Sequence, residues 1–125
     1  MKRKLVMLLA LAAFLATAAV VFAGEKAPSK AVTLTGEVID LYCYMEHPKS
    51  ATGLDHMKCA KSCIKKGLPI GFLSKGVVYT IIGSEHQSAA NMVVDYAGRQ
   101  STIKGKLIEH NGVKAVELVS IKGAK

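Results

Sequence analysis

The fold is decided by the C-terminal segment TIKGKLIEHNGVKAVELVSI, residues 102–121. An Asn-Gly pair stands at its centre, and this pair is the strongest short-range signal for a β-hairpin because both residues tolerate positive φ angles. We therefore predict two antiparallel strands, residues 102–109 and 113–121, joined by a turn over His110-Asn111-Gly112.

A second hairpin is predicted upstream of the first. Residues 68–73 are followed by a Ser74-Lys75-Gly76 turn and by the apolar run 77–82. Farther upstream, residues 32–41 alternate between two faces, which is typical of a β-strand. Gly36 within that run predicts a bend or bulge that curls the strand. The chain therefore contains five predicted strands.

A helix is predicted between the first strand and the upstream hairpin. The segment Thr52-Gly-Leu-Asp55 has the form of a capping box, and the helix that it opens is expected to run to about Lys66. Gly67 suits the position that follows a helix C-terminus. The preceding residues 42–50 have mixed polarity and are expected to form a loop.

A second helix is expected to begin at Ser84 or Glu85, to reach about Tyr96 and to be closed by Gly98. Five strands with a helix between the third and the fourth is the order of an OB-fold, a small Greek-key barrel. We predict a mainly β, OB-like barrel, and a small α+β sandwich built from the same elements is the alternative. The predicted core consists of Val32, Leu34, Val38, Val78, Ile81, Ile103, Leu107, Val116, Leu118 and Ile121.

The composition indicates one small domain. The chain has 125 residues, of which 50% are hydrophobic, 17 are basic and 9 are acidic. This balance excludes a multidomain enzyme and a polytopic membrane protein. A basic OB-fold is compatible with nucleic-acid binding, but the lysines are scattered and few aromatic residues are placed to stack on bases. We therefore expect no nucleic-acid partner.

The first 23 residues have the layout of a secretory signal peptide. Basic residues at 2–4 precede an apolar run at 5–21, and Ala23 is a small residue before a cleavage point at Gly24. The predicted parts are a signal peptide at 1–23, a leader at 24–31, an OB-like domain at 32–122 and, within it, a helical insertion at 43–67. We expect export to the bacterial periplasm with no transmembrane segment after cleavage, and a retained N-terminal anchor is the alternative.

Three cysteines and one histidine form a candidate metal site. His56, Cys59 and Cys63 are spaced by three and four residues on the predicted helix, so their side chains lie on neighbouring turns of one face. Cys43, beyond the first strand, can close the site from the opposite side. Three cysteines with one histidine are an established zinc ligand set. We predict that these four residues bind zinc in an exported protein that is not an enzyme.

The same site has three further candidate ligands and an alternative metal. His47 is a spare ligand if His56 points elsewhere, and Met45 and Met57 are thioether donors close in sequence. Thiolates and thioethers are soft ligands that copper(I) prefers, so copper(I) is the alternative ion.

The charged residues around the cluster are interpreted as structural. The face opposite the histidine and cysteines carries Lys58, Lys61 and Lys65 and is expected to lie in water, while the His/Cys face turns toward the body of the protein. Asp40, Glu46 and Asp55 are interpreted as a solvated strand end, a loop charge and a helix cap.

Two other functions are kept open for the cysteines. A disulfide from Cys43 to Cys59 or Cys63 would close a loop of about 15–20 residues and contribute about 3 kcal/mol in an oxidising compartment. The protein would then be an interaction module for an unidentified envelope protein or a saccharide. Alternatively, a cysteine nucleophile activated by His56 would make it a thiol redox protein, although the sequence indicates no third residue to orient the histidine.

The cysteine motif also carries a family resemblance. The matching residues are Gly36-Glu-Val-Ile-Asp40, Cys43, His56-x-x-Cys59-Ala60-x-x-Cys63 and Gly67-x-Pro69. This pattern resembles a group of small exported bacterial proteins of unassigned function, and the C-terminal hairpin resembles the last two strands of exported OB-fold domains. The resemblance covers most of residues 32–122. It implies the OB-like fold and a secreted location, and it implies no established chemistry.

Overall fold

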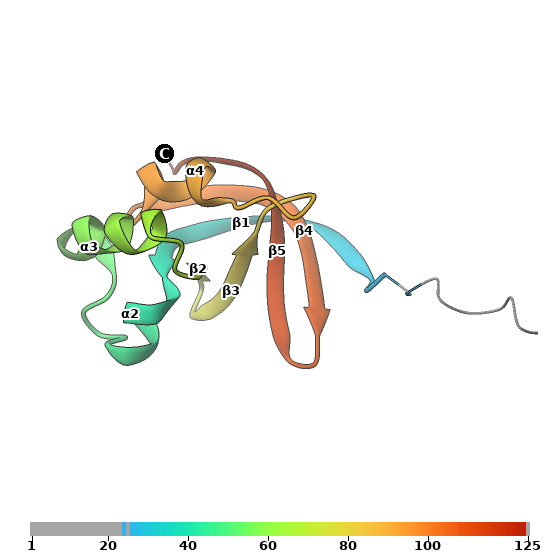
Figure 1. Cartoon of the computed structure of the whole chain (residues 1–125), viewed down its shortest axis with the longest axis horizontal. Helices are drawn as coiled ribbons and strands as arrows, with labels where there is room; N and C mark the ends of the chain where they lie inside the picture. Colours follow the sequence, from blue (N-terminus) through green and yellow to red (C-terminus); the bar gives the residue numbers. More distant parts are fainter. Residues whose placement is uncertain (1–23, 25, 125) are drawn as a thin grey trace, which may run out of the picture.

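The computed structural model describes residues 24 and 26–124, so the predicted signal peptide lies outside the described residues. Strands and helices follow one another in the predicted order (Figure 1). They are β1 (Ser29–Asp40), α2 (Leu41–Glu46), α3 (Gly53–Lys65), β2 (Ile70–Ser74), β3 (Val77–Ile82), α4 (Ala90–Val93), the 3-10 helix η2 (Val94–Tyr96), β4 (Gln100–His110) and β5 (Val113–Gly123). Within the described part of the chain, no helix has both the length and the apolar character that crossing a membrane requires.

The five strands close into a barrel in the order β1-β2-β3-β5-β4. Neighbouring strands are antiparallel, except that β3 and β5 pair in parallel between residues 80–82 and 115–117. β1 pairs with β4 along residues 29–37 and with β2 along residues 37–40, which completes the closure. The closed barrel confirms the OB-like prediction against the α+β sandwich.

Both predicted hairpin turns are confirmed. Lys75 and Gly76 connect β2 to β3 with φ angles of 50° and 77°, and Asn111 and Gly112 connect β4 to β5 with φ angles of 48° and 81°. Two consecutive positive φ angles are the signature of a type I′ turn, whose twist matches that of the flanking strands.

Gly36 is required for close packing and does not form a bulge. The pairing of β1 with β4 continues through Gly36 without a break, and the register shift in the sheet lies instead between Lys104 and Gly105. A Cβ atom on Gly36 would lie 2.1 Å from the carbonyl oxygen of Leu73. The absence of a side chain therefore lets β2 approach β1 where β1 changes partners.

The predicted loop at 42–50 is wrong in its first half, which forms α2. Asp40 is the N-cap of this helix, and its side chain accepts a hydrogen bond of 2.8 Å from the backbone nitrogen of Cys43. Such a cap satisfies a backbone donor that the first turn of a helix leaves free. This local hydrogen bond stabilises a short helix despite the mixed polarity of the segment.

The predicted helix over residues 84–96 is also wrong in its first half. Glu85 and His86 have φ angles of 51° and 63°, which a right-handed helix does not allow. α4 starts only at Ala90, whose backbone nitrogen donates to the side chain of Ser88. Residues 83–89 therefore form a loop.

The core contains most of the predicted residues together with a group that the prediction missed. Val38, Ile81, Ile103, Val116 and Leu118 are buried, and Val32, Leu34, Leu107 and Ile121 pack against them. Val78 is only partly buried and lies outside this cluster. The missed members include Ala60, Ile64, Phe72, Ala89, Val93 and Ala97. Several of these come from α3 and α4, so both helices contribute to the barrel core.

Candidate metal centre

The C-terminal end of α3 forms as the sequence predicts. Gly67 has a φ angle of 86°, its backbone nitrogen donates to the carbonyl of Ile64, and the nitrogen of Leu68 donates to the carbonyl of Cys63. This pair of hydrogen bonds is the Schellman arrangement that ends a helix at a left-handed glycine. The last cysteine of the motif therefore lies on a firmly closed final turn.

The N-terminal end of α3 differs from the predicted capping box. Thr52 occupies the N-cap but makes no side-chain hydrogen bond there, and Asp55 is exposed. The backbone nitrogen of Gly53 instead donates to Glu37 Oε1 on β1, at 2.6 Å. A buried carboxylate of the barrel thus replaces the expected local cap and attaches the start of α3 to β1.

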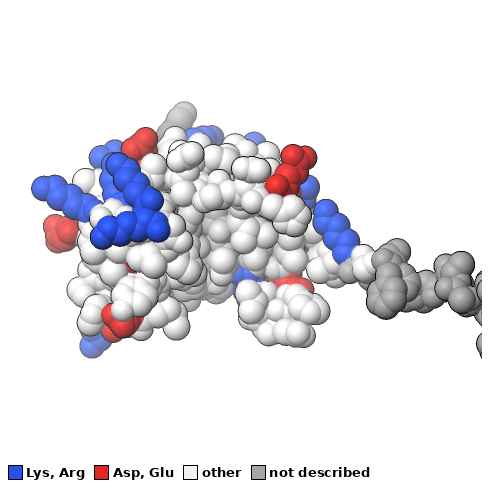
Figure 2. Space-filling view, viewed as in Figure 1, with Lys and Arg blue, Asp and Glu red and all other residues white. Residues whose placement is uncertain are grey.

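The faces of α3 agree with the prediction only in part. Figure 2 shows basic side chains gathered over α3, and Lys58 and Lys65 are exposed as expected. Ala60 and Ile64 are the buried residues of the helix, while Cys59 is exposed. The cysteine face therefore does not point into the barrel. It lies beside the buried residues of the helix, and Cys59 Sγ is 3.9 Å from the Sγ atom of Cys43 on α2.

The structure brings the three cysteine sulfur atoms together. The Sγ atoms of Cys43, Cys59 and Cys63 lie within 4.8 Å of one another, and those of Cys43 and Cys59 are 3.9 Å apart. All three cysteines are free, so the disulfide alternative is not formed. Two sulfur ligands of a tetrahedral zinc ion are separated by about 3.8 Å, given Zn–S bonds of about 2.3 Å. The observed spacing suits a metal ion.

Asp40 is not a solvated strand end, and that interpretation is wrong. Its side chain is fully buried. Oδ1 accepts from the backbone nitrogen of Cys43, and Oδ2 lies 3.1 Å from His56 Nε2. One ligand atom from each of Asp40, Cys43 and His56 lies within 4.8 Å of the others, which makes a second ligand group that shares Cys43 with the first. His56 belongs to this second group and not to the group of three sulfur atoms.

Sequence analysis missed the role of Asp40, although a signal was present. The residue stands at the end of a strand and three positions before Cys43, which is the spacing of an N-cap aspartate to the backbone donor of the first helical turn. The loop prediction for residues 42–50 concealed this cap. The contact with His56 joins residues sixteen positions apart, so no local pattern could have revealed it.

Burial and negative charge keep two of the thiols protonated. The pKa of Cys43 is raised to about 12, first by burial and then by its contacts with Asp40 and Cys59. The pKa of Cys63 is raised by burial and by the charge of Asp40. A nucleophilic cysteine requires the opposite shift. The raised pKa values therefore argue against Cys43 and Cys63 as the nucleophile of a thiol redox site, even though Asp40 is the orienting third residue that such a site would need.

Of the three auxiliary candidates, His47 lies outside both groups of candidate ligands. Met45 is 74% exposed, and His47 lies 3.9 Å from Glu46. Met57 packs against Gly98, which lies between η2 and β4.

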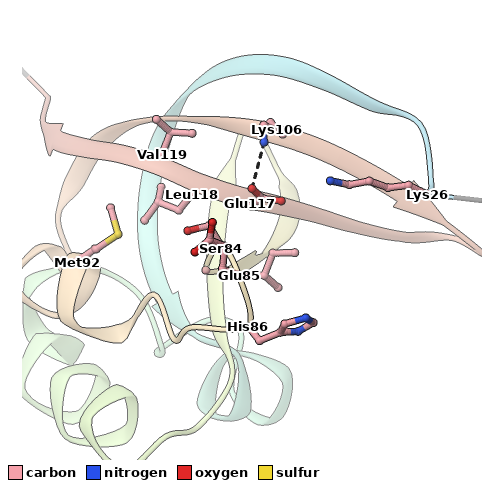
Figure 3. A pocket seen from close by; sticks show the side chains of 11 residues that line it. Lys26, Ser84, Glu85, His86, Met92, Lys106, Glu117, Leu118 and Val119 are labelled. Carbon is pink, nitrogen blue, oxygen red and sulfur yellow. Dashed lines mark hydrogen bonds and ion pairs between the residues drawn. The ribbon is translucent and has the colours of Figure 1, made fainter. Parts of the chain in front are cut away.

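A pocket of about 860 Å³ lies elsewhere on the barrel, between the 83–89 loop and β5 (Figure 3). An ion pair of 3.2 Å between Lys106 of β4 and Glu117 of β5 lies in its wall. Ser84, Glu85 and His86 line the loop side, and no cysteine contributes to the lining. The pocket and the cysteine cluster are therefore separate features.

Comparison with known proteins finds no family model, no curated protein and no solved structure that matches this chain. The family resemblance therefore stays a prediction, and the structure supports only its cluster of three cysteines.

Proposed function

We propose that the protein is an exported, non-catalytic domain that binds a zinc ion between α2 and α3. The observation that carries this proposal is the convergence of three cysteine sulfur atoms within 4.8 Å of one another. Cys43 comes from one helix, and Cys59 and Cys63 come from another. A metal ion would therefore link the two helices of the insertion.

Zinc fits the chemistry of the neighbouring groups. Three thiolates carry three negative charges, and the buried Asp40 lies close to Cys43, so a divalent ion neutralises more of the local charge than a monovalent one. His56 lies within 4.8 Å of the ligand atoms of Cys43 and Asp40, and it would supply a fourth ligand if its ring approached the other two sulfur atoms. Zinc accepts this mixture of sulfur and nitrogen in tetrahedral geometry.

Copper(I) is the second candidate, and the position of His56 favours it. The imidazole bonds to Asp40 and is not grouped with all three sulfur atoms. A set of three thiolates without a nitrogen ligand suits a soft monovalent ion. His56→Ala separates the two metals, because it should weaken zinc binding and leave copper(I) binding unchanged.

Native mass spectrometry of the full chain expressed in bacteria, purified under reducing conditions, tests the proposal. We expect one metal ion per chain and three alkylatable thiols after denaturation. Cys59→Ser should abolish stoichiometric metal, because Cys59 supplies one of the three sulfur atoms. Ser62→Ala is the matched control on the exposed side of the same helix, and it should retain the metal. A wild-type chain that stays metal-free when offered zinc and copper(I) would overturn the proposal.

Export to the periplasm completes the proposal. The supporting features are the predicted signal peptide at 1–23 and the family resemblance of the cysteine motif. Expression of the whole chain with a C-terminal tag, followed by fractionation, tests the location. A periplasmic product whose mass begins at Gly24 is the expected result, and a membrane-bound product of full mass would favour the retained anchor. Recovery in the cytoplasm would contradict export.

A further inference from the structure

Asp40 is fully buried, and both of its oxygen atoms have partners. Oδ1 accepts from the backbone nitrogen of Cys43, and Oδ2 lies 3.1 Å from His56 Nε2. When Asp40 is ionised, its carboxylate only accepts hydrogen bonds, and Nε2 then carries the proton in this contact. In a neutral imidazole the lone pair is then left on Nδ1.

We propose that Asp40 is a positioning residue that fixes His56 in the Nε2–H tautomer and thereby makes Nδ1 the atom available to a metal. This inference rests on the proposed function and deepens it. Histidine ligands of metals commonly donate their second ring N–H to a carboxylate, which fixes the tautomer and the orientation of the ring. The same carboxylate caps the helix that carries Cys43, so Asp40 positions two candidate ligands at once.

Asp40→Asn separates these two tasks. Asparagine is as good an N-cap as aspartate, so its side-chain oxygen should keep the bond from the backbone nitrogen of Cys43 and preserve α2. The amide nitrogen then faces His56, and it can only donate. His56 Nε2 must become the acceptor, which moves the ring proton to Nδ1. The substitution therefore inverts the tautomer and protonates the nitrogen that we assign to the metal.

Nitrogen-15 NMR of the metal-free full chain tests the tautomer directly. At pH 7.5 we expect the Nε2–H form of His56 in the wild type and the Nδ1–H form in Asp40→Asn, with little change in the backbone amide spectrum elsewhere. A wild-type ring in the Nδ1–H form, or one protonated at both nitrogen atoms, would overturn the inference. This measurement does not depend on metal binding.

Zinc affinity, measured by competition with a chelator, tests the consequence. We expect binding about 10–100-fold weaker in Asp40→Asn, which is the usual effect of losing the carboxylate partner of a histidine ligand. Glu117→Gln is the control, because Glu117 is a partly buried carboxylate of β5 that pairs with Lys106 away from the cysteine cluster. Its affinity should equal that of the wild type. In a His56→Ala background, Asp40→Asn should cause no further loss.

The two proposals fail in different ways. A wild-type chain that binds no metal contradicts the proposed function, and the tautomer measurement still decides the role of Asp40. A wild-type chain that binds zinc with an affinity equal to that of Asp40→Asn supports the metal site and contradicts the positioning role. If Asp40→Asn lowers zinc affinity by the same factor in the wild-type and His56→Ala backgrounds, Asp40 does not act through the histidine.

Discussion

The Sγ atoms of Cys43 and Cys59 lie 3.9 Å apart although sixteen positions separate the two residues. Two buried carboxylates of β1 make this approach possible. Asp40 caps the helix that carries Cys43, and Glu37 binds the first backbone nitrogen of the helix that carries Cys59. Because both carboxylates lie on β1, which pairs with both β4 and β2, the cysteine cluster is attached to the barrel through this strand.

Glu37→Ala should destabilise the protein by about 1–3 kcal/mol, because the backbone nitrogen of Gly53 loses its acceptor in a poorly hydrated place. Urea unfolding of the metal-free protein measures this loss. Glu37→Gln keeps an acceptor oxygen at the same position and should lie closer to the wild type. Equal stability of the alanine variant and the wild type would mean that the hydrogen bond does not anchor α3.

Zinc binding should weaken as the pH falls. The pKa of Cys43 is raised to about 12 and that of Cys63 is also raised, so a metal must displace thiol protons at neutral pH. Each displaced proton lowers the apparent affinity by about tenfold per pH unit of acidification. Calorimetric titration in buffers of different ionisation enthalpy should report proton release on binding. Binding that is independent of pH between 6 and 8 would contradict thiolate ligation.

The metal-free protein should lose stability at alkaline pH. The folded-state pKa of Cys43 is raised from 9.0 to about 12, so the unfolded chain releases this proton first as the pH rises. The contribution is fully present below pH 9 and is lost progressively between pH 9 and 12. Cys43→Ser removes the thiol, and its unfolding free energy should fall less steeply over that range. Parallel pH profiles of the two proteins would exclude this contribution.

The sequence was sufficient for the barrel because its determinants are local. Asn111 and Gly112 encode a turn, and the alternation that begins at residue 32 encodes a strand, of which residues 36–40 are buried on both faces. Of the candidate site, the sequence predicted only that the cysteines come together, since helical spacing places Cys59 beside Cys63. The bonds of Asp40 to His56 and of Glu37 to Gly53 each join residues sixteen positions apart. Such contacts depend on how the helices pack against the barrel, which no local pattern contains.

Gly36→Ala should destabilise the barrel by about 1–3 kcal/mol or more, because the added Cβ would lie 2.1 Å from the carbonyl oxygen of Leu73. The two strands would have to separate where β1 passes from β4 to β2. Gly123→Ala is the control, since a Cβ there meets no atom within 4 Å. Thermal unfolding of both variants measures the difference. A loss of similar size in the two would show that the close approach at Gly36 is not what matters.

The two hairpin turns provide a reciprocal prediction. Lys75 and Asn111 occupy equivalent first positions of Xaa-Gly turns, with φ angles of 50° and 48°. Asparagine tolerates the left-handed conformation better than lysine, because its short polar side chain can bond locally to the backbone. Lys75→Asn should therefore stabilise the protein by about 0.5 kcal/mol, and Asn111→Lys should destabilise it by a similar amount. Chemical denaturation of both variants measures these changes. Lys75 and Asn111 are both exposed, so a loss of side-chain packing would not explain stability changes of opposite sign in the two variants. A loss of stability in both variants would contradict turn conformation as the cause.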